Sequence, residues 1–249
     1  MIDDYILSVK SLAVVYQKNI VLDDLTFEVP RHTITGIIGP NGAGKSTFLK
    51  AAMGFVKPLA GSILFDGLSV SKYRKKIAYV PQRSAIDWDF PINVFEVVKM
   101  GLYPKMKFFS FCRPSDKKAI WEALDQVGMT AYAQRHISEL SSGQQQRVFI
   151  ARALLQNADI YLLDEPFTGV DMATEKDIMG ILKNLKQAGK TIFIVHHDLN
   201  CVTDYFDWLV VLNKKLIGSG SVSDVFTDDI LKKAYGRSIF YLNHPNSIK

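Results

Sequence analysis

Residues 39–47 combine glycines with a lysine, a serine and a threonine in the order that phosphate-binding loops use. They read Gly-Pro-Asn-Gly-Ala-Gly-Lys-Ser-Thr and fit G-x-x-x-x-G-K-[ST] on Gly39, Gly44, Lys45 and Ser46. Glycines let the backbone wrap closely, so that successive N–H groups converge on a polyphosphate. We therefore expect Lys45 to lie against the β- and γ-phosphates and the Ser46 hydroxyl to bind the Mg²⁺ that bridges them.

Two carboxylates follow an apolar run elsewhere in the chain. Residues 160–163 read Ile-Tyr-Leu-Leu, and Asp164 and Glu165 come directly after them. A strand that is apolar on both faces belongs in the middle of a parallel sheet, and such sheets bind ligands at their carboxyl edge. We expect Asp164 to hold Mg²⁺ through water and Glu165 to act as the general base on an attacking water.

A third buried strand, at residues 191–195, delivers His196, His197 and Asp198 to the same kind of edge. A histidine there can donate a hydrogen bond to a γ-phosphate oxygen. The alternative is a zinc site made by His196, His197 and Cys201. Adjacent histidines at a strand end point in opposite directions, which makes shared ligation awkward.

Three weaker signals complete the chemistry. Gln82 follows a buried strand and a proline, so its amide can reach a metal-bound water or a nucleotide from a loop. Tyr16 ends the first strand, where its ring can stack on a base. The bland alternatives are a surface glutamine and an ordinary strand tyrosine. Residues 140–147 are rich in Ser, Gly and Gln and lead into a helix at 148–155, which predicts a second anion site at the positive helix end.

The elements that must position these residues alternate between strand and helix. Strand-like spacing at 6–15 and 20–29 predicts a hairpin with a turn at 17–19. Further strands are expected at 33–38, 62–65, 77–80, 160–163, 191–195, 208–212 and 215–218, and helices at 47–53, 94–100, 115–126 (with Ser115 as cap), 148–155, 172–187 and 229–235.

The stretch between Pro91 and Leu140 interrupts this alternation with helices alone, which predicts a helical subdomain. Within it, Phe108, Phe109 and Phe111 lie close together in sequence. They predict either an exposed apolar patch for a partner or packing against the subdomain itself.

Composition sets the class of protein. The chain has 249 residues and is 48% hydrophobic, which is enough for one large domain or a core with a subdomain. No apolar run approaches the roughly 18 residues of a membrane helix, and the acidic N-terminus does not resemble a signal peptide, so we expect a cytosolic protein. Cys112 and Cys201 are expected to be packing residues. The charge of +5 is read as a solvated face and not as a nucleic-acid or membrane surface.

Together these stretches closely resemble the ATP-binding cassette (ABC) family of transporter nucleotide-binding subunits, over essentially the whole chain. The match covers the Walker A loop, the Q-loop, the signature, the Walker B pair, the D-loop and the switch histidine, in that order. Catalysis is assigned to Gln82, Glu165 and His197, and Mg²⁺ binding to Ser46, Gln82 and Asp164. Nucleotide contact is assigned to Tyr16, Gly39, Pro40, Asn41, Gly42, Ala43, Gly44, Lys45, Ser46, Thr47, Ser141, Ser142, Gly143, Gln144 and Asp171.

The resemblance implies an α/β fold, with a RecA-like P-loop NTPase core, an antiparallel β layer and an inserted helical subdomain. We expect a single ABC ATP-binding domain, with the core and β layer at 1–91 and 141–220, the subdomain at 92–140 and a C-terminal appendage at 221–249. In this family the signature helix closes on the ATP of a second, head-to-tail copy. The implied partners are therefore a homodimer mate, an integral membrane permease and an extracytoplasmic metal-binding protein, with no nucleic acid. The implied location is the cytoplasmic face of the inner membrane, as a peripheral subunit.

Two positions depart from the family pattern. The signature usually reads Leu-Ser-Gly-Gly-Gln, and here its third place is Ser142, whose hydroxymethyl group could weaken closure or be tolerated. His32 stands where a glycine often precedes the Walker A strand, which leaves the shape of that turn open.

Within the family, residues 82–91 and 97–101 resemble the subunits of manganese, zinc and iron importers. The function expected from this resemblance is ATP hydrolysis that energises a separate permease for divalent metal ions. The rivals are a subunit for another substrate, such as an iron chelate, a lipid or a drug, and a soluble cassette protein of DNA repair or translation. Repair members of that kind carry long coiled-coil insertions and translation members usually carry two cassettes, and this chain has neither.

Overall fold

The structure of the chain is a computed structural model that describes residues 4–16, 18–106 and 112–236. The predicted turn residue Gln17 and the aromatic cluster at Phe108, Phe109 and Phe111 lie outside the described residues, as does the end of the predicted appendage.

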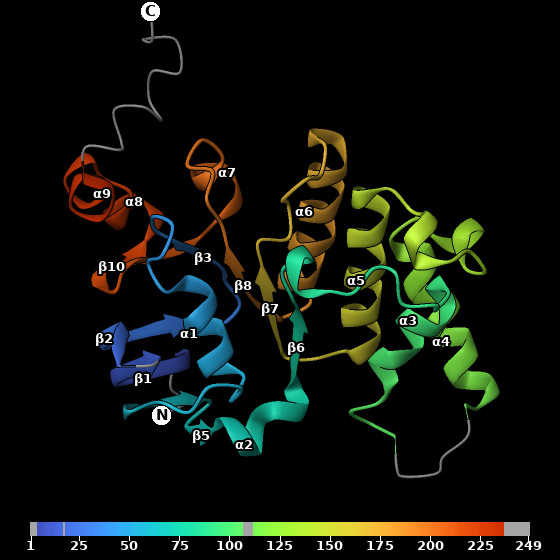
Figure 1. The fold of residues 1–249 in the computed structure, drawn as a ribbon, viewed down its shortest axis with the longest axis horizontal. Coiled ribbons are helices and arrows are strands. Elements are labelled where there is room, and N and C mark those ends of the chain that lie inside the picture. Colours follow the sequence, from blue (N-terminus) through green and yellow to red (C-terminus); the bar gives the residue numbers. More distant parts are fainter. Residues whose placement is uncertain (1–3, 17, 107–111, 237–249) are drawn as a thin grey trace, which may run out of the picture. The chain divides into compact units, whose positions relative to one another are not determined.

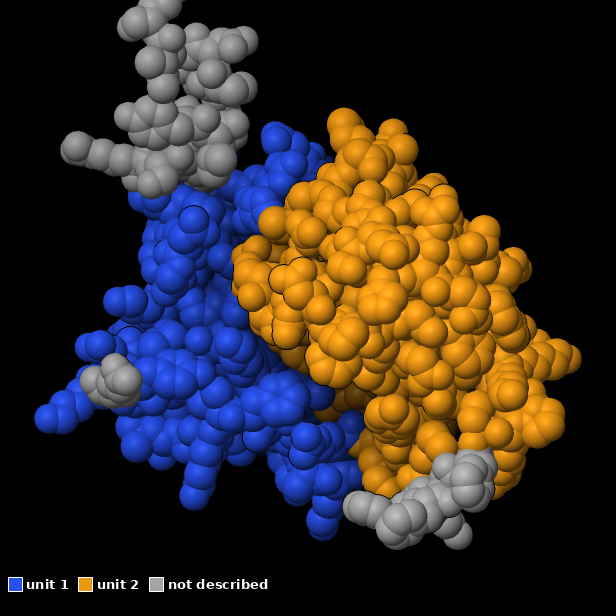
Figure 2. All heavy atoms as spheres, turned by 45° about the vertical axis from the view of Figure 1, so that its right-hand side comes forward, with its two compact units in different colours: residues 1–74, 191–249 blue, residues 75–190 orange. Residues whose placement is uncertain are grey.

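The chain divides into two compact units, drawn in different colours in Figure 2. Unit 1 comprises residues 1–74 and 191–249, and unit 2 comprises residues 75–190. The two units divide the chain at other places than the core and subdomain boundaries expected above. Those boundaries stay a prediction.

Unit 1 is built on two groups of strands (Figure 1). The first is an antiparallel sheet in the order β2-β1-β4-β5, in which the predicted N-terminal hairpin is confirmed as the pair β1 and β2. In the second, β3 runs parallel to both β8 and β9, and β10 pairs with β9 as an antiparallel hairpin. The strands are β1 (Tyr5–Tyr16), β2 (Asn19–Pro30), β3 (Ile34–Ile38), β4 (Ala60–Phe65), β5 (Leu68–Ser69), β8 (Thr191–Val195), β9 (Trp208–Asn213) and β10 (Lys215–Ser221).

The helices of unit 1 are short. They are α1 (Lys45–Ala52), α2 (Val70–Tyr73), α7 (Val202–Tyr205), α8 (Val222–Val225) and α9 (Asp228–Tyr235). Helix α1 packs on strand β2, where the Phe48 and Phe27 rings lie 5.5 Å apart between centroids. Every residue of β3 and β8 is buried, as the sequence predicts for strands covered on both faces.

Among its described residues, unit 2 contains one parallel strand pair and four helices, three of which have 13 residues or more. The elements are β6 (Ile77–Val80), α3 (Val94–Lys99), α4 (Pro114–Gln126), α5 (Ser142–Gln156), β7 (Ile160–Asp164) and α6 (Met172–Gln187), with 3₁₀ turns at 83–85, 100–102, 130–132 and 137–139. Helix α5 contacts β6 as well as α3 and α4, so it is the central helix of this unit (Figure 1). Strand β7 is buried throughout and ends in the two predicted carboxylates.

Several helix boundaries correct the sequence predictions; α1, for example, begins at Lys45 and not at Thr47. Helix α4 begins at Pro114, and the Asp116 carboxylate accepts the Arg113 N–H at 2.8 Å, so Ser115 is not its cap. Helix α5 begins at Ser142 and not at 148, because Ser141 and Gln144 form a capping box around its first turn. Helix α3 ends at Lys99, and a 3₁₀ turn at 100–102 continues it.

Among the helices of the described residues, none combines the length and the apolar character that a membrane span requires.

Candidate functional site

The predicted site residues fall into two groups, one in each unit. Unit 1 carries the phosphate loop, Tyr16 and His197, and unit 2 carries Gln82, the signature residues, Asp164, Glu165 and Asp171.

The phosphate loop connects β3 to α1, as the motif requires. Lys45 opens α1 and is 6% exposed, and its Nζ donates to the carbonyl oxygens of Gly39 at 2.7 Å and Pro40 at 3.0 Å. The ammonium group is therefore held over the loop. Gly44 has φ of +95°, and a Cβ there would lie 2.4 Å from the Leu22 side chain, so only glycine fits.

The turn between β9 and β10, which was not among the predicted site residues, contacts the backbone of this loop and holds it in place. The Lys214 N–H, between β9 and β10, donates to the Ala43 carbonyl at 3.0 Å. A Cβ on Gly39 would lie 2.0 Å from the Leu212 carbonyl oxygen, so the loop touches the end of β9. Asn213 in turn donates through Nδ2 to the Ala234 carbonyl at 2.9 Å, which ties α9 to the same turn. The predicted appendage is thus part of the loop's support.

The two strand-end histidines of unit 1 have different surroundings. The His196 side chain is buried and its backbone N–H donates to the Ile37 carbonyl, which keeps β8 in register with β3. The His197 side chain is exposed, and its ring centroid lies 5.8 Å from that of His196. His197 thus follows β8 beside the strand that leads into the phosphate loop.

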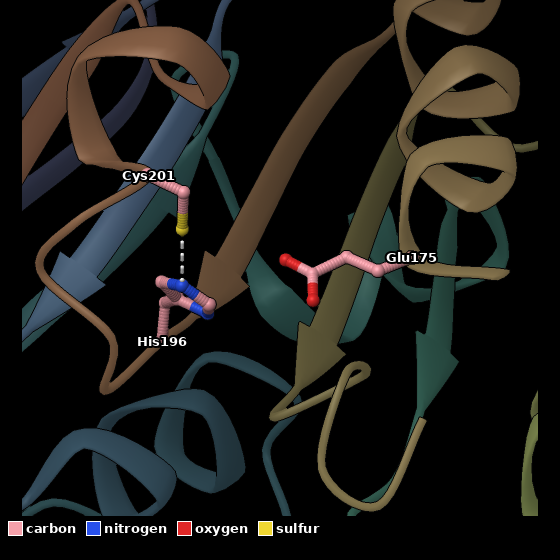
Figure 3. Close-up of side chains that lie close together, drawn as sticks. All are labelled: Glu175, His196 and Cys201. Atoms are coloured by element: carbon pink, nitrogen blue, oxygen red, sulfur yellow. Dashed lines mark hydrogen bonds between the residues drawn. The ribbon is translucent and has the colours of Figure 1, made fainter. Parts of the chain in front are cut away.

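The Nε2 of His196 lies 2.9 Å from the Sγ of Cys201, and the two side chains point toward each other (Figure 3). Cys201 is half-buried. The sequence predicted only a packing role for Cys201, but its thiol also makes a polar contact with the His196 ring.

Tyr16 is the last residue of β1 and is 40% exposed. Its ring is available to a flat ligand, as base stacking requires.

The paired carboxylates of unit 2 differ in burial and in partners. Asp164 ends β7 and is 2% exposed. Glu165 follows with φ of +50°, in the left-handed region that residues other than glycine seldom adopt. The Glu165 Oε2 accepts a hydrogen bond from Gln82 Nε2 at 2.8 Å and from the Thr168 hydroxyl at 3.4 Å. Two residues that the sequence analysis placed in one site, Gln82 and Glu165, are thus in direct contact.

Tyr79 on β6 is a partner of Asp164 that sequence reasoning missed. Burial, together with the charge of Asp164 and a hydrogen bond to it, raises the pKa of Tyr79 to about 12. The phenol therefore stays protonated and donates to the Asp164 carboxylate. No local pattern marks this contact, because it depends on the pairing of β6 with β7, in which Tyr79 lies opposite Leu162 and Asp164 follows two residues later.

The signature residues form the first turn of α5. The Ser141 hydroxyl accepts the Gln144 N–H at 3.3 Å, and the Gln144 side chain accepts the Ser141 N–H at 3.0 Å. That first turn has no acidic residue, so the partial positive charge of the helix end is not neutralised within it. This arrangement suits an anion.

Asp171 caps the next helix, α6. Its carboxylate accepts the Thr174 N–H at 2.9 Å and the Thr174 hydroxyl at 2.8 Å. These two hydrogen bonds lower the pKa of Asp171 below its ordinary value.

The oxygen donors expected for Mg²⁺ suit that ion chemically. Ser46, Gln82 and Asp164 offer a hydroxyl, an amide oxygen and a carboxylate, which are the hard ligands that Mg²⁺ takes. Gln82 donates to Glu165 through its Nε2, which is compatible with a ligand role for its amide oxygen.

Comparison with known proteins gives the family. The ABC transporter family profile matches residues 22–168. The chain is 48% identical over 230 residues to the manganese transport system ATP-binding protein MntB of Listeria innocua, which covers 92% of this chain and 96% of that protein. It is 49% identical over 235 residues to the zinc transport system ATP-binding protein TroB of Treponema pallidum, and the match covers 94% of this chain and 88% of that protein.

Solved structures show the same fold. The dimeric post-hydrolysis structure of the ATP-binding cassette MJ0796 bound to ADP and Pi aligns with a TM-score of 0.77 at 27% identity, over 87% of this chain and 98% of that one. The expected P-loop NTPase fold with its antiparallel β layer and helical region is confirmed. The chain therefore belongs to the ABC transporter family, as one of its P-loop ATPases.

Proposed function

We propose that this chain is the ATP-hydrolysing subunit of an importer for a divalent transition-metal ion, manganese or zinc, and that it energises a separate membrane permease. The observation that carries the proposal is identity of nearly one half, along nearly the whole chain, to ATP-binding proteins of a manganese and a zinc transport system. A full set of phosphate-binding and hydrolytic residues supports it.

In unit 1, Lys45 and the N-terminus of α1 bind the β- and γ-phosphates, and the Ser46 hydroxyl binds Mg²⁺. The remaining loop residues from Gly39 to Thr47 supply backbone N–H groups. Tyr16 stacks on the adenine. His197 donates to a γ-phosphate oxygen, and its exposed position leaves it accessible to that ligand.

In unit 2, Glu165 takes a proton from the water that attacks the γ-phosphate, and the bond between the β,γ-bridging oxygen and the γ-phosphorus breaks to leave ADP. Asp164, held by Tyr79, and Gln82 are ligands of the Mg²⁺ sphere. When bound, Mg²⁺ neutralises charge on the phosphate oxygens. Gln82 lies in a loop and donates a hydrogen bond to the Glu165 carboxylate. In this proposal the loop changes position when Glu165 exchanges Gln82 for the attacking water.

The functional assembly in this proposal is a head-to-tail homodimer. The signature residues Ser141–Gln144 and the D-loop residue Asp171 of each copy face the nucleotide held by the other copy. The first turn of α5 has no acidic residue, which supports this assignment because the positive helix end is suited to a bound anion.

The further partners are a membrane permease and an extracytoplasmic metal-binding protein, and no nucleic acid is involved. The chain would work as a peripheral subunit on the cytoplasmic face of the membrane. Relatives described as ATP-binding proteins of transport systems support a permease partner. The proposal also keeps the boundaries between the core and the helical subdomain that the sequence predicts.

Replacing Glu165 by Gln is the direct test of the hydrolytic assignment. The amide keeps an acceptor for Gln82 but cannot take a proton, so ATP binding is expected to persist while turnover falls by at least about 100-fold, the range of general base catalysis. ATP should also drive the purified variant into a stable dimer, measured by light scattering. Wild-type hydrolysis in the variant would remove Glu165 from its role.

Metal uptake tests the substrate. Cells that lack the chain should lose uptake of radioactive manganese or zinc, and the wild-type chain, but not Lys45→Ala, should restore it. A deletion that impairs only iron-chelate uptake would refute the assignment to manganese or zinc while leaving the ATPase intact.

A further inference from the structure

The serine that departs from the family signature makes a hydrogen bond that a glycine could not make. The Ser142 hydroxyl donates to the Gly169 carbonyl at 2.6 Å. Ser142 is the first residue of α5, and Gly169 lies in the loop that connects β7 to α6. Both residues belong to unit 2, so one hydrogen bond joins two segments that are far apart in sequence.

A second contact joins the same two segments. A Cβ on Gly143 would lie 3.3 Å from the Thr174 Cγ2, so the α5 backbone packs on the start of α6. Thr174 is the residue whose N–H and hydroxyl Asp171 accepts. The first turn of α5 and the cap of α6 are therefore adjacent.

The loop between β7 and α6 is itself ordered by short-range bonds. The Thr168 N–H donates to the Glu165 carbonyl at 3.3 Å, and the Val170 N–H donates to the Phe167 carbonyl at 3.2 Å. Gly169 has φ of +74°, which turns the chain at the residue whose carbonyl Ser142 binds. This loop has Glu165 at one end and Asp171 at the other.

We propose that the Ser142 hydroxyl is a positioning group that fixes the loop bearing Asp171 to the first turn of α5. The two segments then form one preformed surface, which meets a second copy of this chain and the nucleoside triphosphate bound to that copy. The inference rests on the head-to-tail dimer of the proposed function and deepens it. If the surface is already ordered in the free chain, association costs less conformational entropy, and the dimer is therefore tighter. The serine then favours closure, in contrast to the weakening that the sequence left open.

The first test measures the free protein. Hydrogen exchange without nucleotide should be faster in Ser142→Ala than in the wild type at residues 141–145 and 169–174, by about threefold to tenfold, the range for one neutral hydrogen bond. Alanine is a good helix former, so slackening in this variant cannot come from helix propensity. Ser142→Thr keeps the hydroxyl and should restore slow exchange. Ser71→Ala removes an exposed hydroxyl from unit 1, where Ser69 is its partner at 3.1 Å, and should change neither segment.

The second test measures dimerisation in the Glu165→Gln background. Ser142→Ala and Ser142→Gly should each raise the ATP concentration for half-maximal dimer by about threefold to tenfold, and Ser142→Thr should stay within about twofold of Ser142.

The outcomes separate the two hypotheses. Equal exchange and equal dimerisation in Ser142→Ala, or stronger dimerisation in Ser142→Gly, would overturn the positioning role and leave the ATPase proposal standing. If Glu165→Gln with Ser142 intact does not dimerise with ATP, the head-to-tail assembly itself is wrong, and hydrogen exchange still decides whether Ser142 orders the loop.

Discussion

At the scale of single residues, Asp171 has a structural task in addition to the chemical one proposed for it. Its carboxylate caps α6 through Thr174, and the two hydrogen bonds lower its pKa. Because the pKa is lower in the folded protein than in the unfolded chain, ionised Asp171 stabilises the fold above the ordinary carboxylate pKa of about 3.9, and this contribution is lost as the pH falls through the folded value.

Asp171→Ala is therefore expected to lower the melting temperature at pH 7, whereas Asp171→Asn keeps a cap acceptor and should lower it less. The difference between the wild type and Asp171→Ala should shrink as the pH is reduced below the ordinary carboxylate range. Circular dichroism melts across pH values measure this. A difference that grows in acid would mean that the carboxylate is not stabilised by these hydrogen bonds.

Between elements, side chains connect the Gln82 loop to the signature helix. Arg83 Nη2 donates to Gln145 Oε1 of α5 at 2.9 Å, and the Trp88 indole donates to the Arg83 carbonyl at 3.0 Å. The Trp88 ring in turn meets the Phe149 ring of α5 edge to face, with centroids 5.3 Å apart. The loop and the helix are thus joined by polar and aromatic contacts within unit 2.

A double-mutant cycle tests this connection. Arg83→Met and Gln145→Leu together should destabilise unit 2 less than the sum of the two single changes, with a coupling of about 0.5–1.5 kcal/mol in the free energy of unfolding. The matched control pairs Arg83→Met with Asp177→Asn, whose partner is Arg147 at 2.7 Å, and should be additive. Additivity of Arg83→Met with Gln145→Leu would show that their hydrogen bond carries no energy.

For the whole molecule, the head-to-tail proposal predicts that two inactive chains complement each other. Lys45→Ala disables a chain's own phosphate loop, and Ser141→Arg blocks the signature that it offers to its mate. In a mixed dimer, one composite site combines the intact loop of one chain with the intact signature of the other. An equal mixture should then recover about a quarter of wild-type ATPase activity, since about half of the dimers are mixed and each has one intact site of two.

Each variant alone should stay inactive while melting close to the wild type, which shows that loss of activity is not unfolding. If the mixture also stays inactive although mixed dimers are isolated, both groups act within one chain and the composite site is refuted.

The sequence by itself determined most of the elements, and it supplied the residues to which the chemistry is assigned in the proposed function. The phosphate loop lies between a buried strand and a helix as predicted, and α6 and β8 have the predicted bounds. These features follow from local periodicity and turn residues, which a short window of sequence contains. The start of α5 was also local, since Ser141 and Gln144 have capping-box spacing, and the prediction missed it.

Only the tertiary structure decided which side chains meet. Tyr79 reaches Asp164, Gln82 reaches Glu165, and Ser142 reaches Gly169 from separate elements. Such contacts depend on strand order, register and helix packing, which bring distant residues within hydrogen-bond distance and leave no trace in local periodicity. The effect of the hydroxymethyl group at Ser142 stayed open for that reason, because its hydrogen-bond acceptor is a backbone carbonyl that no residue pattern identifies.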